Sequence, residues 1–281
     1  MSNKIRKIDS SSIPQTPLSP AGPATAGIDY DKKRGLVINH DTENGRTVLP
    51  GPAFVIPDFR KLVSEFDDFN GDLLDTRWNT QVGNDSLPPS ALINVQQHGV
   101  MRLLTGNDAG ADHASNGVQF EGRLSWKPTN KNLVFEARVK VDVITSLAWF
   151  LGFTDQTAAL EFPVTLSGTT FTTNATDAVG FLFDTAATTD TWRMVGVATD
   201  VDATMQDSGY APVAAEYETF RVEVDAAGTA TFFRNGVQIG VPMKNAVTPT
   251  VALVPVIAAF ARNTTSKNVD VDYIAVRQSR A

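Results

Sequence analysis

The chain contains no cysteine, which excludes disulfides, thiolate metal sites and a cysteine nucleophile. Histidine is scarce as well, and the three that occur, His40, His98 and His113, are not spaced as ligands of one metal ion. We therefore expect neither a metal nor another cofactor. A β-rich chain without disulfides has to draw its stability from core area, from oligomerisation or from bound ions.

Long apolar runs are also missing. No stretch approaches the roughly 18 consecutive apolar residues of a membrane-spanning helix. Residues 1–9 are mostly charged or polar, so we expect no secretory signal and synthesis in a host cytoplasm. Positive charge is in deficit, with 24 Lys and Arg against 31 Asp and Glu and a formal net charge of −7. That balance argues against nucleic acid and membranes as partners.

The composition changes near residue 60. Seven of the 15 prolines lie before it, but none of the four tryptophans does. Because proline fixes φ and lacks an N–H donor, we expect residues 1–60 to be an extended N-terminal arm, followed by a folded domain over residues 61–281. Short apolar clusters in the arm are candidate anchors on a partner surface: Ile13, Leu18, Leu36, Val37, Ile38, Phe54, Val55 and Ile56.

Period-2 alternation is the strongest signal in the rest of the chain. Along Leu133–Val143, apolar residues alternate with Glu136, Arg138, Lys140 and Asp142. Thr219–Asp225 repeats the pattern, and Asn235-Gly236 separates the two runs that follow it, as in a type I′ hairpin. Residues 219–241 are therefore predicted to form three antiparallel strands in a meander.

Further strands are predicted along the whole domain. Helical periodicity appears only around Phe59–Phe66. About ten strands without helices between them predict an all-β fold, an antiparallel two-sheet jelly-roll sandwich. The further strands are Gly99–Thr105, Val118–Trp126, Ala148–Phe153, Val179–Asp184, Trp192–Thr199, Val251–Arg262 and Val269–Arg277.

Two acidic loops are candidate metal sites. The first, Gly106–Gly117, holds Asp108, Asp112 and His113, and a cation site there competes with a solvated loop tip, which we favour. The second cluster is Asp200, Asp202 and Asp207. It lacks the glycine and the terminal glutamate of an EF-hand loop, so a solvated turn is expected.

Catalytic motifs are weak. Neither a G-x-S-x-G elbow nor a phosphate-binding P-loop occurs. Glycoside hydrolysis needs two carboxyl groups close together. The nearest pattern is Glu223-Val224-Asp225-Ala226-Ala227-Gly228, and we favour its explanation as surface charges that alternate with core residues. The four tryptophans form either a sugar-stacking platform or, as we favour, part of the core: Trp78, Trp126, Trp149 and Trp192.

Several segments together resemble one known family. They are Phe66–Trp78, Asn132–Val143, Val179–Phe183, Phe220–Gly236 and Val269–Val276. In this order they resemble the concanavalin-like lectin and glucanase sandwiches, over about Glu65 to Gln278. The glucanase branch carries E-x-D-x-x-E on its catalytic strand. Gly228 departs from that pattern, which argues against hydrolysis.

A sandwich of this kind behind a flexible arm is also similar to bacteriophage virion proteins, particularly capsid decoration proteins and head fibres. That resemblance implies a non-enzymatic structural protein in the virion. It also implies attachment to the major capsid protein and a symmetric homo-oligomer, expected to be a trimer. Two alternatives remain open: a lectin-like receptor-binding module for surface glycans, centred on Gly106–Gly117 and Trp149, and a glycanase that depends on Glu223.

Overall fold

The computed structural model of the chain describes residues 27–31, 36–41, 45–47, 61–83, 90–93, 99–157, 160 and 162–280. The chain divides into two units, Met1–Arg60 and Lys61–Ala281. In the first unit, β1 (Gly27–Asp31), β2 (Leu36–Asp41) and β3 (Gly45–Thr47) form an antiparallel sheet in the order β1-β2-β3.

The expected arm therefore contains a small sheet. Of the candidate anchors, Leu36, Val37 and Ile38 belong to β2. The remaining anchors lie outside the described residues: Ile13, Leu18, Phe54, Val55 and Ile56.

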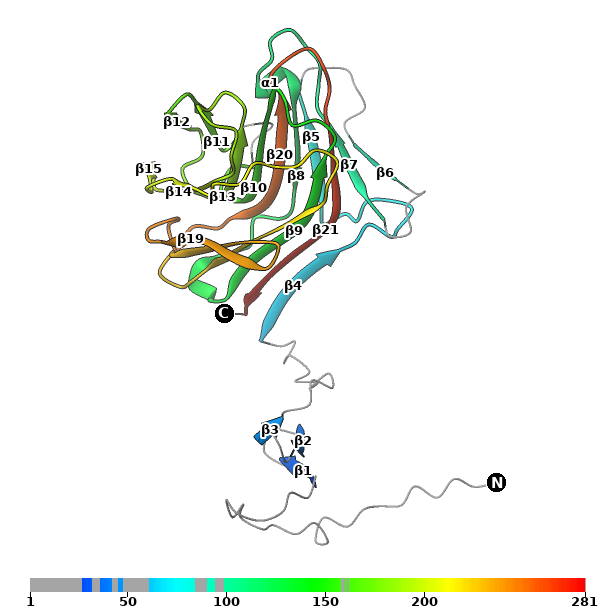
Figure 1. Cartoon of the computed structure of the whole chain (residues 1–281), viewed down its shortest axis with the longest axis vertical. Coiled ribbons are helices and arrows are strands. Elements are labelled where there is room, and N and C mark those ends of the chain that lie inside the picture. The colour runs from blue at the N-terminus through cyan, green and yellow to red at the C-terminus, as the bar shows by residue number, and fades with distance from the viewer. Residues whose placement is uncertain are drawn as a thin grey trace, which may run out of the picture. The chain divides into compact units, whose positions relative to one another are not determined.

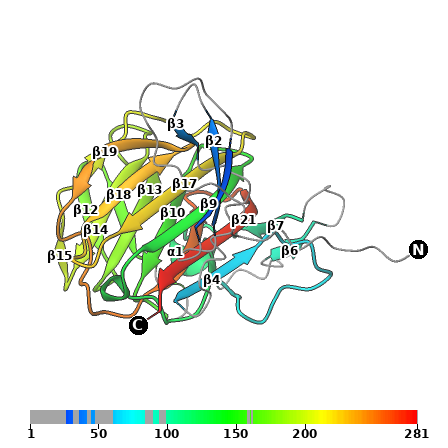
Figure 2. The ribbon, with the colours of Figure 1, turned by 90° about the horizontal axis from the view of Figure 1, so that it is seen from below.

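The second unit contains two large antiparallel sheets (Figure 1). We call the first the front sheet, and Figure 2 shows its strands side by side. Its order is β19 (Val237–Met243), β18 (Ala230–Arg234), β17 (Glu218–Val224), β9 (Leu133–Val141), β21 (Asn268–Ser279), β7 (Met101–Leu104) and β6 (Ser90–Leu92), with β4 (Leu62–Asp67) also paired to β21.

The other sheet is called the back sheet. Its order is β15 (Val201–Asp202), β14 (Arg193–Ala198), β13 (Ala178–Asp184), β10 (Leu147–Thr154), β20 (Val254–Ala261), β8 (Gly117–Glu121) and β5 (Asn79–Val82), with β16 (Gln206–Asp207) paired to β14. A short helix α1 (His113–Asn116) and a 3₁₀ turn η1 (Pro128–Asn130) interrupt the strands. Among the described residues, no helix combines the length and the apolar character needed to cross a membrane.

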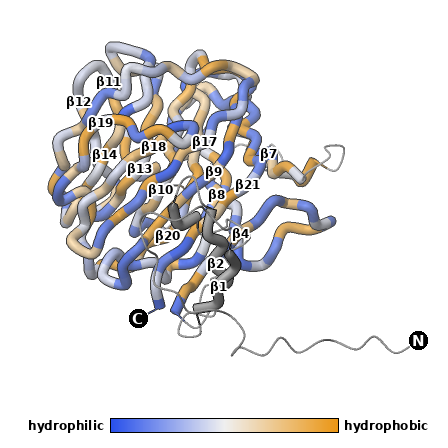
Figure 3. Tube along the Cα trace, turned by 60° about the horizontal axis from the view of Figure 1, so that its bottom comes forward, coloured by the Kyte–Doolittle hydropathy of each residue, from blue (hydrophilic) through white to orange (hydrophobic). Residues whose placement is uncertain are grey.

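The core lies between the two sheets because each contributes its apolar face to it. Along the front sheet, hydrophobic and hydrophilic residues alternate (Figure 3). Phe135, Val222 and Phe232 of the front sheet are fully buried, as are Phe181 and Phe183 of the back sheet. The predicted all-β antiparallel sandwich is confirmed. The three-stranded meander is present as β17, β18 and β19.

The expected helical segment at Phe59–Phe66 is wrong. The described part of this segment forms strand β4, which adds to β21 with Phe66 opposite Ala275. Pairing with a neighbouring strand outweighs the weak helical periodicity, since the pairing satisfies the backbone groups of β4.

A hairpin that the sequence did not reveal covers the back sheet. Strands β11 (Val164–Ser167) and β12 (Thr170–Thr173) pair with each other and lie beside β13 (Figure 1). Phe162, Val164 and Leu166 pack against a second apolar cluster that includes Phe150 and Phe260. The central strands β10, β13 and β20 of the back sheet are therefore buried on both faces.

Strands β10 and β13 approach each other so closely at Gly152 that we expect no larger residue to be tolerated there. A Cβ atom at Gly152 in β10 would lie 2.2 Å from the backbone oxygen of Val179 and 2.7 Å from the Cα atom of Gly180. We expect Gly152→Ala to lower the free energy of unfolding by about 3 kcal/mol, because backbone atoms cannot move aside cheaply. Urea unfolding monitored by tryptophan fluorescence measures the change.

The matched control is Gly236→Ala in the β18–β19 turn. Gly236 also has a positive φ, of 79°, but a Cβ atom there would meet nothing within 4 Å. Its cost should be limited to the left-handed backbone, about 1 to 2 kcal/mol. Equal losses for the two variants would contradict the steric explanation.

Candidate functional site

The outer face of the back sheet is covered over its central strands β10, β13 and β20. The outer-facing positions of β13 are Ala178, Gly180, Leu182 and Asp184. Asp184 is their one acidic residue, and it accepts hydrogen bonds from Arg262 at 2.6 and 2.5 Å. Because the hairpin β11–β12 and its apolar cluster cover this region, it offers no open surface for a ligand. The polar outer face of the front sheet is the alternative.

Strand register places one row of residues across that face. Ala275 of β21 lies opposite both Phe66 of β4 and Glu136 of β9. Glu136 in turn lies opposite Arg221 of β17, and Arg221 lies opposite Phe233 of β18. With neighbouring strands about 4.8 Å apart, the row from Phe66 to Phe233 spans roughly 19 Å. An aromatic ring thus stands at each end, with charged groups between them.

The charged groups of this row contact one another. Arg221 Nη1 lies 3.8 Å from Glu136 Oε2, and Arg221 Nε lies 3.0 Å from Glu223 Oε1. The hydroxyl of Tyr273 donates a hydrogen bond of 2.8 Å to Glu136 Oε1. The two carboxylates are therefore held on either side of a single guanidinium.

Aromatic rings border these charges. Phe66 is 57% exposed, and its ring centroid lies 6.0 Å from that of Tyr273. The guanidinium carbon of Arg221 lies 4.1 Å from the centroid of the Phe233 ring. The combination of flat apolar rings with hydrogen-bonding charged groups suits a ligand that has both apolar faces and hydroxyl groups.

Two hollows open on this face. The smaller, of about 270 Å³, is lined by Phe66, Glu136, Arg221 and Ala275 among others. The larger, of about 660 Å³, is lined by Glu223, Thr229, Thr231 and Pro242 among others. Val134 and Arg277 line both hollows, so the two are adjacent and form one trough.

Two titratable groups of β4 and β21 are perturbed. Burial, together with the hydrogen bond to Glu136 and the charge of Glu136, raises the pKa of Tyr273 to about 12. Burial also raises the pKa of Glu65, against the opposing charges of Arg77 and Arg123. Glu65 lies opposite Val276, whose side chain is in the core, so its carboxyl group points away from the trough although the residue lines the smaller hollow.

In the first candidate metal loop, the aspartate side chains accept hydrogen bonds from the loop's own backbone N–H groups. Asp108 accepts from the N–H of Gly110 at 2.7 Å, and Asp112 caps α1 by accepting from the N–H of Ser115 at 2.8 Å. His113 packs its ring 6.1 Å from that of Phe260. Within the described part of the chain, no three histidine, aspartate or glutamate side chains converge as metal ligands.

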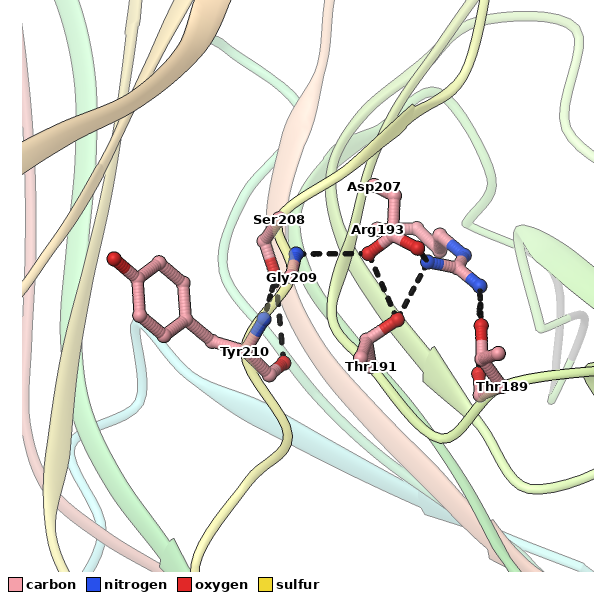
Figure 4. Close-up of polar contacts among 7 residues, drawn as sticks. All are labelled: Thr189, Thr191, Arg193, Asp207, Ser208, Gly209 and Tyr210. Carbon is pink, nitrogen blue, oxygen red and sulfur yellow. Dashed lines mark hydrogen bonds and ion pairs between the residues drawn. The ribbon is translucent and has the colours of Figure 1, made fainter.

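The second acidic cluster is dispersed. Asp202 accepts from the Thr173 hydroxyl at 2.5 Å, and Asp200 lies in a turn in which its N–H donates to Thr176. Asp207 instead joins a network around the buried Arg193 (Figure 4). Burial opposes ionisation of Asp207, but the Gly209 N–H, the hydroxyl of Thr191 and Arg193 together lower its pKa.

Arg193 also binds Thr191 at 2.5 Å and the hydroxyl of Thr189 (Figure 4). This network ties β16 to β14 at the edge of the back sheet.

The tryptophans do not form a ligand platform. All four are buried in the core, with exposed fractions of 5% or less: Trp78, Trp126, Trp149 and Trp192. The core interpretation is confirmed, and the proposed glycan contact through Trp149 is wrong. The rings on the outer face of the front sheet belong to Phe66, which is exposed, and to Phe233, which is half-buried, and no sequence motif indicated either. Their outward positions follow from alternation, but their alignment with Glu136 follows only from strand register.

Comparisons of the structure identify the fold. The chain matches a Bacillus licheniformis β-glucanase with a TM-score of 0.53 and 12% identity, covering 76% of this chain and 97% of the glucanase. A lichenase derived from a mouse hindgut metagenome matches with a TM-score of 0.52 and 9% identity, covering 76% and 98%. The carbohydrate recognition domain of Emp47p matches with a TM-score of 0.52 and 11% identity, covering 80% and 99%. No protein-family model and no curated protein matches the sequence.

These matches contradict the expectation of a non-enzymatic virion protein. Three of the matched structures are named as a β-glucanase, a lichenase and a glycosidic hydrolase, and none of these findings connects the chain with a capsid or a phage. The expectation rested on strand order and a proline-rich arm. Both describe how a chain folds, and neither specifies the chemistry of a site. The resemblance to the concanavalin-like glucanase and lectin sandwiches is confirmed at the level of fold.

Tyr273 provides a test of the site geometry. We expect Glu136→Gln to lower the pKa of Tyr273 from about 12 towards its ordinary value, because the variant removes a negative charge while burial remains. A tyrosinate absorbance titration, assigned by difference from Tyr273→Phe, measures the shift. The raised pKa means that the folded state favours the neutral phenol of Tyr273. The shift therefore adds to the free energy of unfolding below about pH 10, and this contribution is lost as the pH rises towards 12.

Tyr217 is the internal control for that titration. Its pKa is raised by burial, and its charged neighbours are Lys140, Asp270 and Asp272. It should therefore titrate alike in the wild type and in Glu136→Gln. An unchanged pKa of Tyr273 in the variant would contradict the hydrogen bond to Glu136.

Proposed function

We propose that the chain is a glycoside hydrolase that cleaves a polysaccharide on the outer face of the front sheet. The observation that carries this proposal is the pair of carboxylates, Glu136 and Glu223, that both contact Arg221. Glu136 and Arg221 lie in the row between Phe66 and Phe233, and Glu223 lies two residues along β17 from Arg221. The fold adds support, since the glucanase and the lichenase that share it are named for their action on glycans.

The spacing of the carboxylates suits this chemistry. Each contacts the same guanidinium, at 3.8 and 3.0 Å, so the contacting oxygens are at most roughly 9 Å apart. Glycoside hydrolysis uses two carboxyl groups about 5 Å apart for retention and about 6.5 to 9.5 Å apart for inversion. The upper limit therefore leaves the pair within reach of a single glycosidic bond.

The two hollows suggest the role of each acid. Glu136 lines the smaller hollow beside Phe66, where its protonated form would donate a proton to the oxygen of the departing sugar. Glu223 lines the larger hollow, which has room for the water molecule that it would activate as a base. Phe66 and Phe233 would stack on sugar rings at the two ends of the row.

Glycan binding without cleavage is the second candidate. One observation favours it: Arg221 lies between the two carboxylates, where the scissile bond of a substrate would have to enter. In this case the charged row would hydrogen-bond sugar hydroxyls and leave the glycan intact.

The test compares cleavage and binding in the same protein. Full-length wild type is assayed for reducing-sugar release from neutral β-linked glucans and galactans, and for binding by affinity electrophoresis. We expect Glu136→Gln and Glu223→Gln each to lower kcat by about 100-fold or more, with a small change in KM, because each removes one proton-transferring group.

The matched control is Glu216→Gln, because Glu216 is exposed and lines neither hollow. It should cleave at the wild-type rate. Full activity of either site variant would overturn the assignment of these acids. Wild-type binding without any release of reducing sugar would support the second candidate.

A further inference from the structure

We infer that the larger hollow binds an acidic sugar unit, whose carboxylate or sulfate group is held by Arg277. The inference rests on the proposed function, because it concerns the same trough. It goes further by naming the chemical class of glycan that the trough would prefer.

Strand β21 places Arg277 at the junction of the two hollows. Tyr273, Ala275 and Arg277 lie at alternate positions of β21, and Arg277 is exposed. The residues opposite it are Ser64 of β4 and Val134 of β9, neither of which carries a charge. The guanidinium is therefore presented to the trough with uncharged neighbours on both adjoining strands.

The other charged side chains that line the larger hollow already have partners within the protein. Glu223 forms an ion pair with Arg221, and the Asp225 carboxylate accepts from the N–H groups of Ala227 and Thr229 at 2.8 and 2.9 Å. By contrast, the guanidinium of Arg277 has no hydrogen-bond or ion-pair partner in the part of the chain that the structure describes. Its charge is available to a ligand.

The walls of the hollow suit a sugar. Thr229 and Thr231 are half-buried and line it, so their hydroxyls can exchange hydrogen bonds with sugar hydroxyls, and Pro242 adds an apolar wall. The volume of about 660 Å³ lies within the usual range for sites that bind small molecules. A guanidinium binds the planar carboxylate, or the oxygens of a sulfate, through two parallel hydrogen bonds.

The experiment measures a ratio of affinities. The full chain is titrated at low salt with three polysaccharides of one backbone linkage: neutral, uronate-bearing and sulfated. We expect the wild type to bind one acidic form about 10-fold or more tightly than the neutral form. The two acidic arms distinguish a carboxylate from a sulfate.

Variants of Arg277 test whether the preference for an acidic polysaccharide depends on this side chain. Arg277→Gln should reduce the ratio to about one, and Arg277→Lys should give an intermediate ratio, because lysine keeps the charge but loses the forked geometry. Arg123→Gln is the matched control, because Arg123 is exposed and lines neither hollow. It removes the same charge and should keep the ratio of the wild type.

The outcomes separate the two proposals. If the wild type binds all three polysaccharides equally, or if Arg277→Gln keeps the preference, the inference is wrong and the proposed function stands. If the wild type neither binds nor cleaves any polysaccharide, the proposed function fails and the inference fails with it. Thermal unfolding of each variant confirms that a lost preference does not come from a lost fold.

Discussion

The packing of the hairpin β11–β12 on the outer face of the back sheet is the contact on which the location of function depends. Phe162, Val164 and Leu166 bury the apolar outer positions of β10, β13 and β20, including Phe150 and Phe260. A sheet covered on both faces has to be apolar on both, which is why β10, β13 and β20 are buried along their whole length. The front sheet is left as the face that can carry charge.

Charge on the front sheet is organised by strand pairing. Each outward side chain meets its neighbours across β4, β21, β9, β17 and β18, so a group from one strand finds its partner on the next. Glu136, Arg221 and Tyr273 are brought together from strands far apart in the sequence. The bulge between Val271 and Tyr273 shifts the register of β21 against β9 beside this group.

Local pattern predicted much of the fold. Alternation located β9 and β17, and Asn235-Gly236 located the hairpin of β18 and β19, because each signal is complete within a few neighbouring residues. The hairpin β11–β12 was missed because its residues alternate over only four positions in each strand. The assignment to a virion failed for a different reason, since strand order and a proline-rich segment describe architecture alone.

The order of residues alone predicts which side chains of β9 and β17 face outward, since alternation is a property of each strand. It thereby placed Glu136, Arg221 and Glu223 on a polar face, and it excluded any chemistry that needs cysteine. Three features appear only in the folded chain: Glu136 lies opposite Arg221, Phe66 and Phe233 end the same row, and the central strands of the back sheet are covered. The physical reason is that register and sheet coverage depend on contacts between distant segments, which no local pattern encodes.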